Sequence, residues 1–115
     1  MTPAATYQQG DIVIVHFPFT DVSQTKKRPA LILSNTTVNR TGDYLMVQIT
    51  SQFNADGLSV SITAADFDGP SLPLTSYIRV HKVFLLNGSL IDRRFGAVQP
   101  AFRQAIVAEL ANLLR

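Results

Sequence analysis

Short apolar runs separated by turn-forming residues most restrict the fold of this chain. Each run is too short for an ordinary helix and is rich in Val and Ile, which favour strands. Gly, Pro, Asn and Asp gather between the runs, where the chain must turn. We therefore predict roughly six short strands, at residues 12–17, 29–34, 44–50, 58–62, 76–84 and 92–98.

The connections between these runs differ in kind. PFTDVSQTKK, at 18–27, has neither helical nor strand periodicity and is predicted to be an exposed, mobile loop. Pro29 suits the start of the following strand, where a missing N–H is tolerated. Residues 35–43, 51–57 and 63–75 are expected to form turns or loops, and 85–91 a short helical turn.

The C-terminus is the one segment with clear helical periodicity. Pro100 suits a first helical turn, and apolar residues recur at spacings of three and four at Phe102, Ile106, Leu110 and Leu113. This stripe indicates a face that packs on the core. The expected fold of residues 1–115 is a single mainly β domain with a C-terminal helix, built as a small, strongly bent antiparallel sheet or barrel.

Composition excludes several classes of protein. With 46% hydrophobic and 16% charged residues, the chain differs from disordered proteins. It has no cysteine, so disulfides, thiolate metal sites and a cysteine nucleophile are excluded. We find neither the pattern of a signal peptide nor an apolar run of membrane-spanning length, and we expect a cytoplasmic protein without membrane contact.

Positive charge is clustered although the net charge is only +2. Lys26, Lys27 and Arg28 are consecutive, and further cations stand at 79–82 and 93–94. Such clusters suit an anionic ligand such as a phosphate backbone. The alternative is a set of ordinary solvated faces.

Several catalytic signatures are absent from the sequence. There is no glycine-rich phosphate loop, zinc-ligand spacing, HExxH or GxSxG, so we expect neither a metal nor another cofactor. The remaining candidates are Arg28 at a loop-to-strand junction, the strand-end triple Thr50, Ser51 and Gln52, and a pair at Arg79 and His81. An arginine fork matches phosphate oxygens, and hydroxyl or amide groups add donors beside it.

Alternation along 76–84 assigns its side chains to two faces. Tyr77, Arg79, His81 and Val83 are predicted to share one face, with Ile78, Val80, Lys82 and Phe84 on the other. Arg79 and His81 should therefore point the same way.

In order along the chain, GDIVIVHFPFTD, KKRPALILSN, VQITSQ, SYIRVHKVFLLNGSLIDRRFG and VQPAFRQAIVAELANLL resemble the MazF/PemK toxins of type II toxin–antitoxin systems. FPFTD is most similar to the PemK-like branch. The resemblance implies an SH3-like or CcdB-like barrel, a homodimer and a metal-independent endoribonuclease that cuts single-stranded RNA at short sequences. It also implies silencing by a cognate antitoxin, with operator DNA bound only through the antitoxin complex.

The resemblance also assigns residues. The arginine of the family's RP motif falls on Arg28, and the threonine of its IT(S/A)Q motif on Thr50. An arginine used by some members is retained as Arg79, but His81 stands where they have an acid. Val22 and Ser23 occupy first-loop positions where relatives carry a functional His or Glu.

These residues can be given roles in metal-free RNA cleavage. Arg28 would stabilise the charge that develops on phosphorus, Thr50 would orient Arg28 or donate to a phosphate oxygen, and His81 would serve as base or acid. His16 is a weaker candidate. RNA contacts are expected from Lys26 and Lys27 on a closing loop, from Ser51 and Gln52, and from Phe19 as a stacking surface, with Phe17 and Phe53 also near.

A binding protein on the same fold is the alternative hypothesis. It would be a CcdB-like topoisomerase poison or a homologue without nuclease activity. Arg28 and Thr50 favour the enzyme, whereas the missing loop His or Glu and the replacement of an acid by His81 favour the binder.

Overall fold

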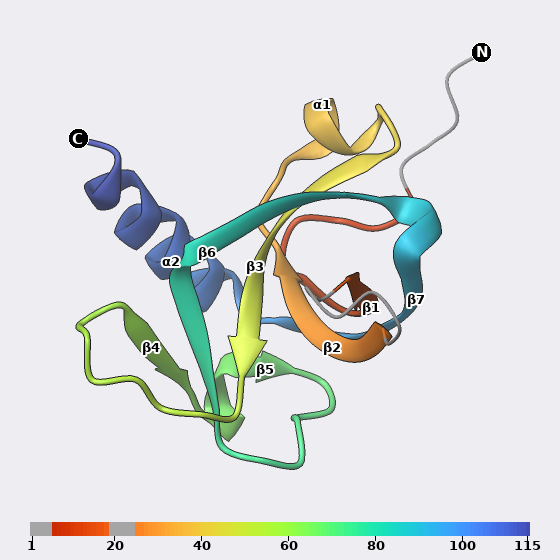
Figure 1. The fold of residues 1–115 in the computed structure, drawn as a ribbon. Helices are drawn as coiled ribbons and strands as arrows, with labels where there is room; N and C mark the ends of the chain where they lie inside the picture. Colours follow the sequence, from red (N-terminus) through yellow and green to blue (C-terminus); the bar gives the residue numbers. More distant parts are fainter. Residues whose placement is uncertain (1–5, 19–24) are drawn as a thin grey trace.

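The structure, a computed structural model, describes residues 6–18 and 25–115, apart from the side chains of residues 17–18 and 25–26. Its centre is a seven-stranded antiparallel sheet that curls strongly (Figure 1). The strand order is β4-β6-β3-β2-β1-β7-β5. The strands are β1 (Asp11–Pro18), β2 (Thr25–Ile32), β3 (Asp43–Thr50), β4 (Ser59–Ile62), β5 (Phe67–Asp68), β6 (Ser76–Asn87) and β7 (Ile91–Val98).

Helices are few and lie at the ends of strands. In the described part of the chain they are α1 (Thr36–Asn39), the 3₁₀ turns η1 (Ala64–Asp66) and η2 (Gly88–Leu90), and α2 (Pro100–Leu113). None of these is long and apolar enough to cross a membrane. The predicted fold, a bent antiparallel sheet with a C-terminal helix, is confirmed.

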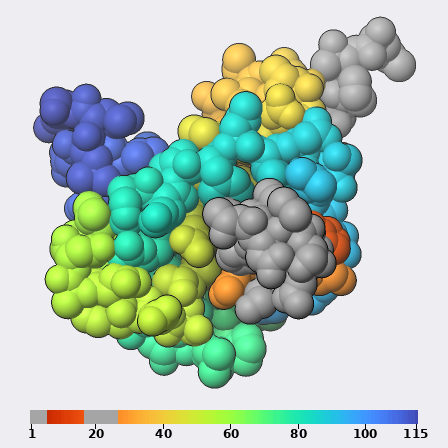
Figure 2. Space-filling view, viewed as in Figure 1, coloured from red at the N-terminus to blue at the C-terminus, as the bar shows by residue number. Residues whose placement is uncertain are grey.

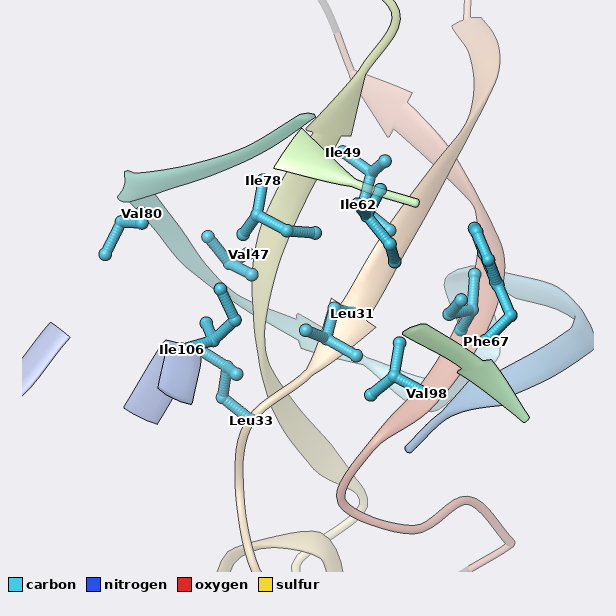
Figure 3. Packing of buried hydrophobic residues seen from close by; sticks show 11 residues of the cluster. Leu31, Leu33, Val47, Ile49, Ile62, Phe67, Ile78, Val80, Val98 and Ile106 are labelled. Atoms are coloured by element: carbon cyan, nitrogen blue, oxygen red, sulfur yellow. The ribbon is translucent and has the colours of Figure 1, made fainter. Parts of the chain in front are cut away.

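Each face of the curled sheet has its own hydrophobic core. The larger core joins inward side chains of the sheet, among them Leu31, Val47 and Ile78, to Ile106 of α2 (Figure 3). Phe102 and Leu110 of α2 pack against it, as the helical stripe predicts, whereas Leu113 is exposed. The smaller core lies on the other face and contains Val13, Val15, Ala30, Ile32, Tyr44, Met46 and Ile91.

Several predicted boundaries are wrong. β2 begins at Thr25, so Lys26 and Lys27 belong to a strand paired with β1 and not to the predicted loop, and Arg28 lies inside that strand and not at its junction with the loop. The predicted loop 63–75 contains η1 and the short strand β5, and the predicted turn 35–43 contains α1, whose first turn is capped by Asn35. β6 continues to Asn87, which leaves only 88–90 for the helical turn.

A bulge in β6 overturns part of the predicted face assignment. Val47 pairs with Val83, but the next residue of β3, Gln48, pairs with Arg79. Extra residues of β6 therefore sit between these two pairs and shift the alternation. Val83 packs on the larger core together with Val80, while Phe84 joins the smaller core, so Val83 does not share a face with Arg79.

Pro29 lies inside β2 and not at its start. It pairs with Ile14 of β1, but the β2–β3 ladder comprises only Ala30, Leu31 and Ile32 of β2. The ladder with β3 ends beside Pro29, which cannot donate a hydrogen bond to it. Below this point β2 and β3 are free to separate.

Candidate functional site

The separation of β2 and β3 places Arg28 and Thr50 beside one another. The ladder ends with the pair Ala30–Gln48, and two residues further along β2 and β3 stand Arg28 and Thr50. Both line a hollow of about 240 Å³, which we call the Arg28 hollow. Its wall also includes Ser51, Lys27 and, from the β5–β6 connection, Leu72, Pro73 and Leu74.

The Arg28 hollow is reached from both faces of the sheet. Pro29 and Ile49 also line it, although they alternate with Arg28 and Thr50 along β2 and β3. Ile14 of β1, which pairs with Pro29, lines it as well. The hollow therefore opens where the two strands part. Arg28 is half-buried at this place. It belongs to β2, so a strand and not a loop holds its backbone.

The hydroxyl of Thr50 is oriented by the turn that follows β3. Its Oγ1 accepts a hydrogen bond from the backbone N–H of Gln52 at 3.1 Å. Because the oxygen is used as an acceptor there, the hydroxyl proton remains to be donated elsewhere. Gln52 thus contributes through its backbone, and its exposed side chain is not part of the hollow's wall.

Arg79 forms a second polar group on the same face, which we call the Arg79 cluster (Asp56, Ser59, Arg79 and His81). Arg79 is 8% exposed, and its Nη1 lies 3.0 Å from Asp56 Oδ2 and 3.0 Å from Ser59 Oγ. The predicted neighbourhood of Arg79 and His81 is confirmed, with Nη2 3.4 Å from His81 Nε2. A guanidinium only donates, so in this contact Nε2 is the acceptor and Nδ1 carries the proton.

The carboxylate of Asp56 is held ionised in this cluster. The backbone N–H of Leu58, 3.0 Å from Oδ1, lowers the pKa of Asp56 below its ordinary 3.8; burial opposes this effect, and Arg79 adds to it. Arg79 therefore has a permanent anionic partner near neutral pH.

Lys27 is paired with an acid. Its Nζ lies 3.6 Å from Asp92 of β7, which also contacts Arg93 at 3.0 Å and His16 Nε2 at 3.8 Å. Burial raises the pKa of Asp92, but the Lys27 and Arg93 cations outweigh it, so the pKa lies below 3.8. His16 thus lies beside Asp92. It pairs with Lys27, the neighbour of Arg28 in β2, and is therefore on the face of the sheet opposite to Arg28.

Two predicted RNA contacts lie outside the described residues or side chains. Phe19 falls in the segment that the structure does not describe, as do Val22 and Ser23. Lys26 has a described backbone in β2, but its side chain is outside the description. Among the described residues, no group of three or more His, Cys, Asp or Glu is arranged to hold a metal ion.

Sequence patterns did not reveal Asp56 and Ser59 as partners of Arg79. Ser59 reaches Arg79 through the β4–β6 register, and Asp56 lies in the turn before β4. The predicted strand 58–62 was the available signal for Ser59. Nothing local to Asp56 indicates a partner more than twenty residues away, because that contact depends on the turn's path.

Solved structures of toxins share this fold. A mycobacterial endoribonuclease in complex with its cognate antitoxin is 26% identical, with a TM-score of 0.74 and 95% of each chain covered. Another mycobacterial endoribonuclease is 25% identical, with a TM-score of 0.71 over 99% of this chain and 92% of that one. The MazE–MazF complex of Deinococcus radiodurans, at 20% identity, has a TM-score of 0.76, with 99% of this chain and 96% of that chain covered.

Family membership follows from the sequence as a whole. Comparison with curated proteins returns no significant match. The model of the family described as PemK-like, MazF-like toxin of type II toxin–antitoxin system matches residues 8–114. That match covers both strands of the Arg28 hollow, the Arg79 cluster and α2, and the chain therefore belongs to the PemK-like, MazF-like toxins of type II toxin–antitoxin systems.

Proposed function

We propose that this toxin is an endoribonuclease that cuts single-stranded RNA at short sequences without a metal ion. The observation that carries the proposal is that a strand-held arginine, Arg28, and the strand-end residue Thr50 line the same hollow. The two mycobacterial endoribonucleases, at 26% and 25% identity, support the same activity.

The reaction is an attack of the ribose 2′-oxygen on its own adjacent phosphorus. A base takes the 2′-hydroxyl proton, the new O–P bond forms, the bond from phosphorus to the 5′-oxygen breaks, and that oxygen receives a proton. On the way, negative charge builds up on the non-bridging oxygens of the five-coordinate phosphorus. Arg28 suits the stabilisation of that charge, since a guanidinium stays charged near neutral pH and presents a fork of donors.

Thr50 supplies a further donor to the phosphate. Its oxygen is occupied by the Gln52 N–H, which leaves the hydroxyl proton for a non-bridging oxygen. Ser51 and Lys27 stand at the wall of the same hollow and would contact the RNA backbone around the scissile bond. Lys26 precedes them in β2, and Phe19 is retained as a stacking candidate.

His81 is proposed as a proton-transfer group. It is exposed, and the 3.4 Å contact of its Nε2 with Arg79 Nη2 orients the ring. Nε2 can exchange a proton with the RNA once that contact opens. Replacing His81 by Ala is expected to slow cleavage by roughly 10²–10⁴-fold, the usual contribution of an acid–base group. Cleavage by His81→Ala at the wild-type rate would remove this role.

The proposed partners follow from the same comparison. We propose a cytoplasmic homodimer that is silenced by a cognate antitoxin, because the mycobacterial enzyme was solved with its own antitoxin. Contact with operator DNA would occur only through the antitoxin complex.

The test compares cleavage by wild type and Arg28 variants. A long single-stranded RNA is incubated with antitoxin-free protein in excess EDTA, and the products are mapped by primer extension. Wild type should give discrete cuts, and Arg28→Ala should slow cleavage at least roughly 10²-fold. Arg28→Lys should recover only part of the rate, since it restores charge but not the fork.

Arg40→Ala is the matched control, because Arg40 is an exposed arginine at the end of α1, away from the hollow. It should cleave as wild type does. Intact RNA with folded, antitoxin-free wild type would overturn the ribonuclease proposal, and DNA gyrase would then be the target to assay.

A further inference from the structure

Phe53, which is exposed, and Tyr77, which is half-buried, form an aromatic pair next to the Arg79 cluster. Their ring centroids are 5.4 Å apart and the ring planes are tilted by 59°. Phe53 is 61% exposed, although the sheet offers two hydrophobic cores. Together with Ser59 and Ser61 the rings line an open hollow of about 450 Å³, which we call the Phe53 pocket.

The volume and lining of the Phe53 pocket suit a flat, partly polar ligand. Small-ligand sites commonly enclose roughly 300–1,000 Å³ and combine aromatic walls with a few polar groups. The pocket supplies two aromatic rings and two hydroxyls. A single exposed phenylalanine is ordinary. Here the exposed ring lies against a second ring, and both line an open hollow.

Strand register connects the Phe53 pocket to both polar groups of the candidate site. Tyr77 pairs with Thr50 on one side and with Ser61 on the other, so all three share one face. Arg79, two residues further on β6, pairs with Ser59. The β3–β4 segment and β6 adjoin on the face seen in Figure 2. An RNA strand whose phosphate lies at Thr50 of β3 therefore has an aromatic surface on the neighbouring strand β6. Neighbouring strands lie about 5 Å apart in the hydrogen-bonding direction.

The contact with Arg79 determines whether the hydroxyl of Ser59 donates or accepts a hydrogen bond. Its oxygen accepts from Arg79 Nη1 at 3.0 Å, which leaves its proton to donate into the pocket. A nucleobase edge offers carbonyl oxygens and ring nitrogens as acceptors, and its face stacks on aromatic side chains. The pocket thus provides one contact for each part of a base.

We propose that the Phe53 pocket is a nucleobase subsite, in which an unpaired RNA base stacks on Phe53 and Tyr77 and accepts a hydrogen bond from Ser59. The inference rests on the proposed ribonuclease function and adds the place where one base beside the scissile phosphate is held. It gives Phe53 a role in choosing the cleavage sequence and not in the chemistry.

The binding test uses single-stranded RNA of mixed sequence in which every 2′-hydroxyl is replaced by fluorine, so the nucleophile is absent. Affinity is measured by fluorescence anisotropy for wild type, Phe53→Ala, Phe53→Leu and Phe53→Tyr. Stacking is worth about 1–3 kcal/mol per base, so Phe53→Ala and Phe53→Leu should weaken binding roughly 5- to 150-fold, whereas Phe53→Tyr should bind within about two-fold of wild type.

Two measurements separate base stacking from phosphate binding. The dependence of affinity on salt should stay unchanged in Phe53→Leu, because no charge is altered, and should become shallower in Arg28→Ala. With cleavable RNA, Phe53→Leu should change the set of sites mapped by primer extension. Leu113→Ala, which shortens an exposed apolar side chain on α2, is the control and should match wild type.

The outcomes distinguish the subsite from the ribonuclease proposal. If wild type cleaves and Phe53→Ala binds and cleaves the same sites equally well, the subsite is wrong and the ribonuclease stands. If wild type binds RNA through Phe53 but cuts none, the subsite stands and the ribonuclease is wrong. If wild type binds no RNA, both are wrong.

Discussion

The two arginines of the candidate site differ in how far they are buried. Arg79 is almost fully buried and holds Asp56 and Ser59, so an incoming phosphate would have to displace a carboxylate. Arg28 is half-buried at an open hollow beside a hydroxyl. Arg28 is therefore the better placed to receive a phosphate, and Arg79 the better placed to hold His81.

At the residue scale, Thr50→Val tests the donated hydroxyl. The substitution keeps the branched shape but removes both the acceptor for Gln52 N–H and the donor toward phosphate. Loss of one such donor costs roughly 10²-fold in rate, and Thr50→Ser should keep most of the activity. Single-turnover cleavage measures both variants, and a wild-type rate in Thr50→Val would show that its side chain only shapes the strand end.

The Asp56 carboxylate makes stability depend on pH in the acid range. Its pKa is lower in the folded chain than the ordinary 3.8, so the folded state binds fewer protons. This contribution to stability is complete above the ordinary pKa and disappears as the pH falls through the folded-state pKa.

Asp56→Asn should therefore flatten the acid end of the stability profile. Urea unfolding of wild type and variant at a series of pH values from neutral to acid gives the two curves. Their separation should be largest near neutral pH and shrink below the ordinary pKa of 3.8. A constant separation at every pH would mean that Asp56 acts through packing and not through its charge.

At the element scale, two irregularities shape the site. Pro29 ends the β2–β3 ladder and lets the Arg28 hollow form, and the bulge in β6 separates Arg79 from the regular pairing of Val83. At both irregularities the strands continue, but their pairing is interrupted, and polar side chains lie there beside a hydrophobic core. The site thus lies where the regular pairing of the sheet is interrupted.

Among the residues of α2, Ile106 is the buried one, and Phe102 and Leu110 pack partly buried beside it. Ile106 is fully buried in the larger core, whereas Leu113 on the same helix is 46% exposed. Ile106→Ala should lower the free energy of unfolding by about 2–5 kcal/mol, and Leu113→Ala by less than about 0.5 kcal/mol. Equal destabilisation of both variants in urea unfolding would show that the exposed end of α2 is also packed in solution.

At the scale of the whole molecule, charge is local. A net charge of +2 gives little general attraction to nucleic acid, so RNA affinity has to come from a few placed cations. Each phosphate contact on single-stranded nucleic acid contributes about −0.7 to the slope of log affinity against log salt. Arg28→Ala should make that slope shallower by about 0.7, with Arg40→Ala unchanged.

Anisotropy titrations of the fluorinated RNA at several salt concentrations measure this slope. A slope that is the same in wild type and Arg28→Ala would place the phosphate away from Arg28 and leave its hollow without that role.

Local sequence signals predicted six of the seven strands in the described residues, the terminal helix and the candidate residues Arg28 and Thr50. Alternating or continuous apolar runs bounded by turn residues are properties of neighbouring residues, and so is the helical stripe around Ile106. The motifs around Arg28 and Thr50 are equally local, and the resemblance of these motifs to a family indicated the toxin fold.

The tertiary structure alone decided what depends on pairing between distant strands. The β6 bulge moved Val83 to the other face, and the β4–β6 register brought Ser59 to Arg79. The connection between β3 and β4 set Asp56 against Arg79 and Phe53 against Tyr77. Such contacts arise from the register of separate strands, which no single stretch of sequence specifies.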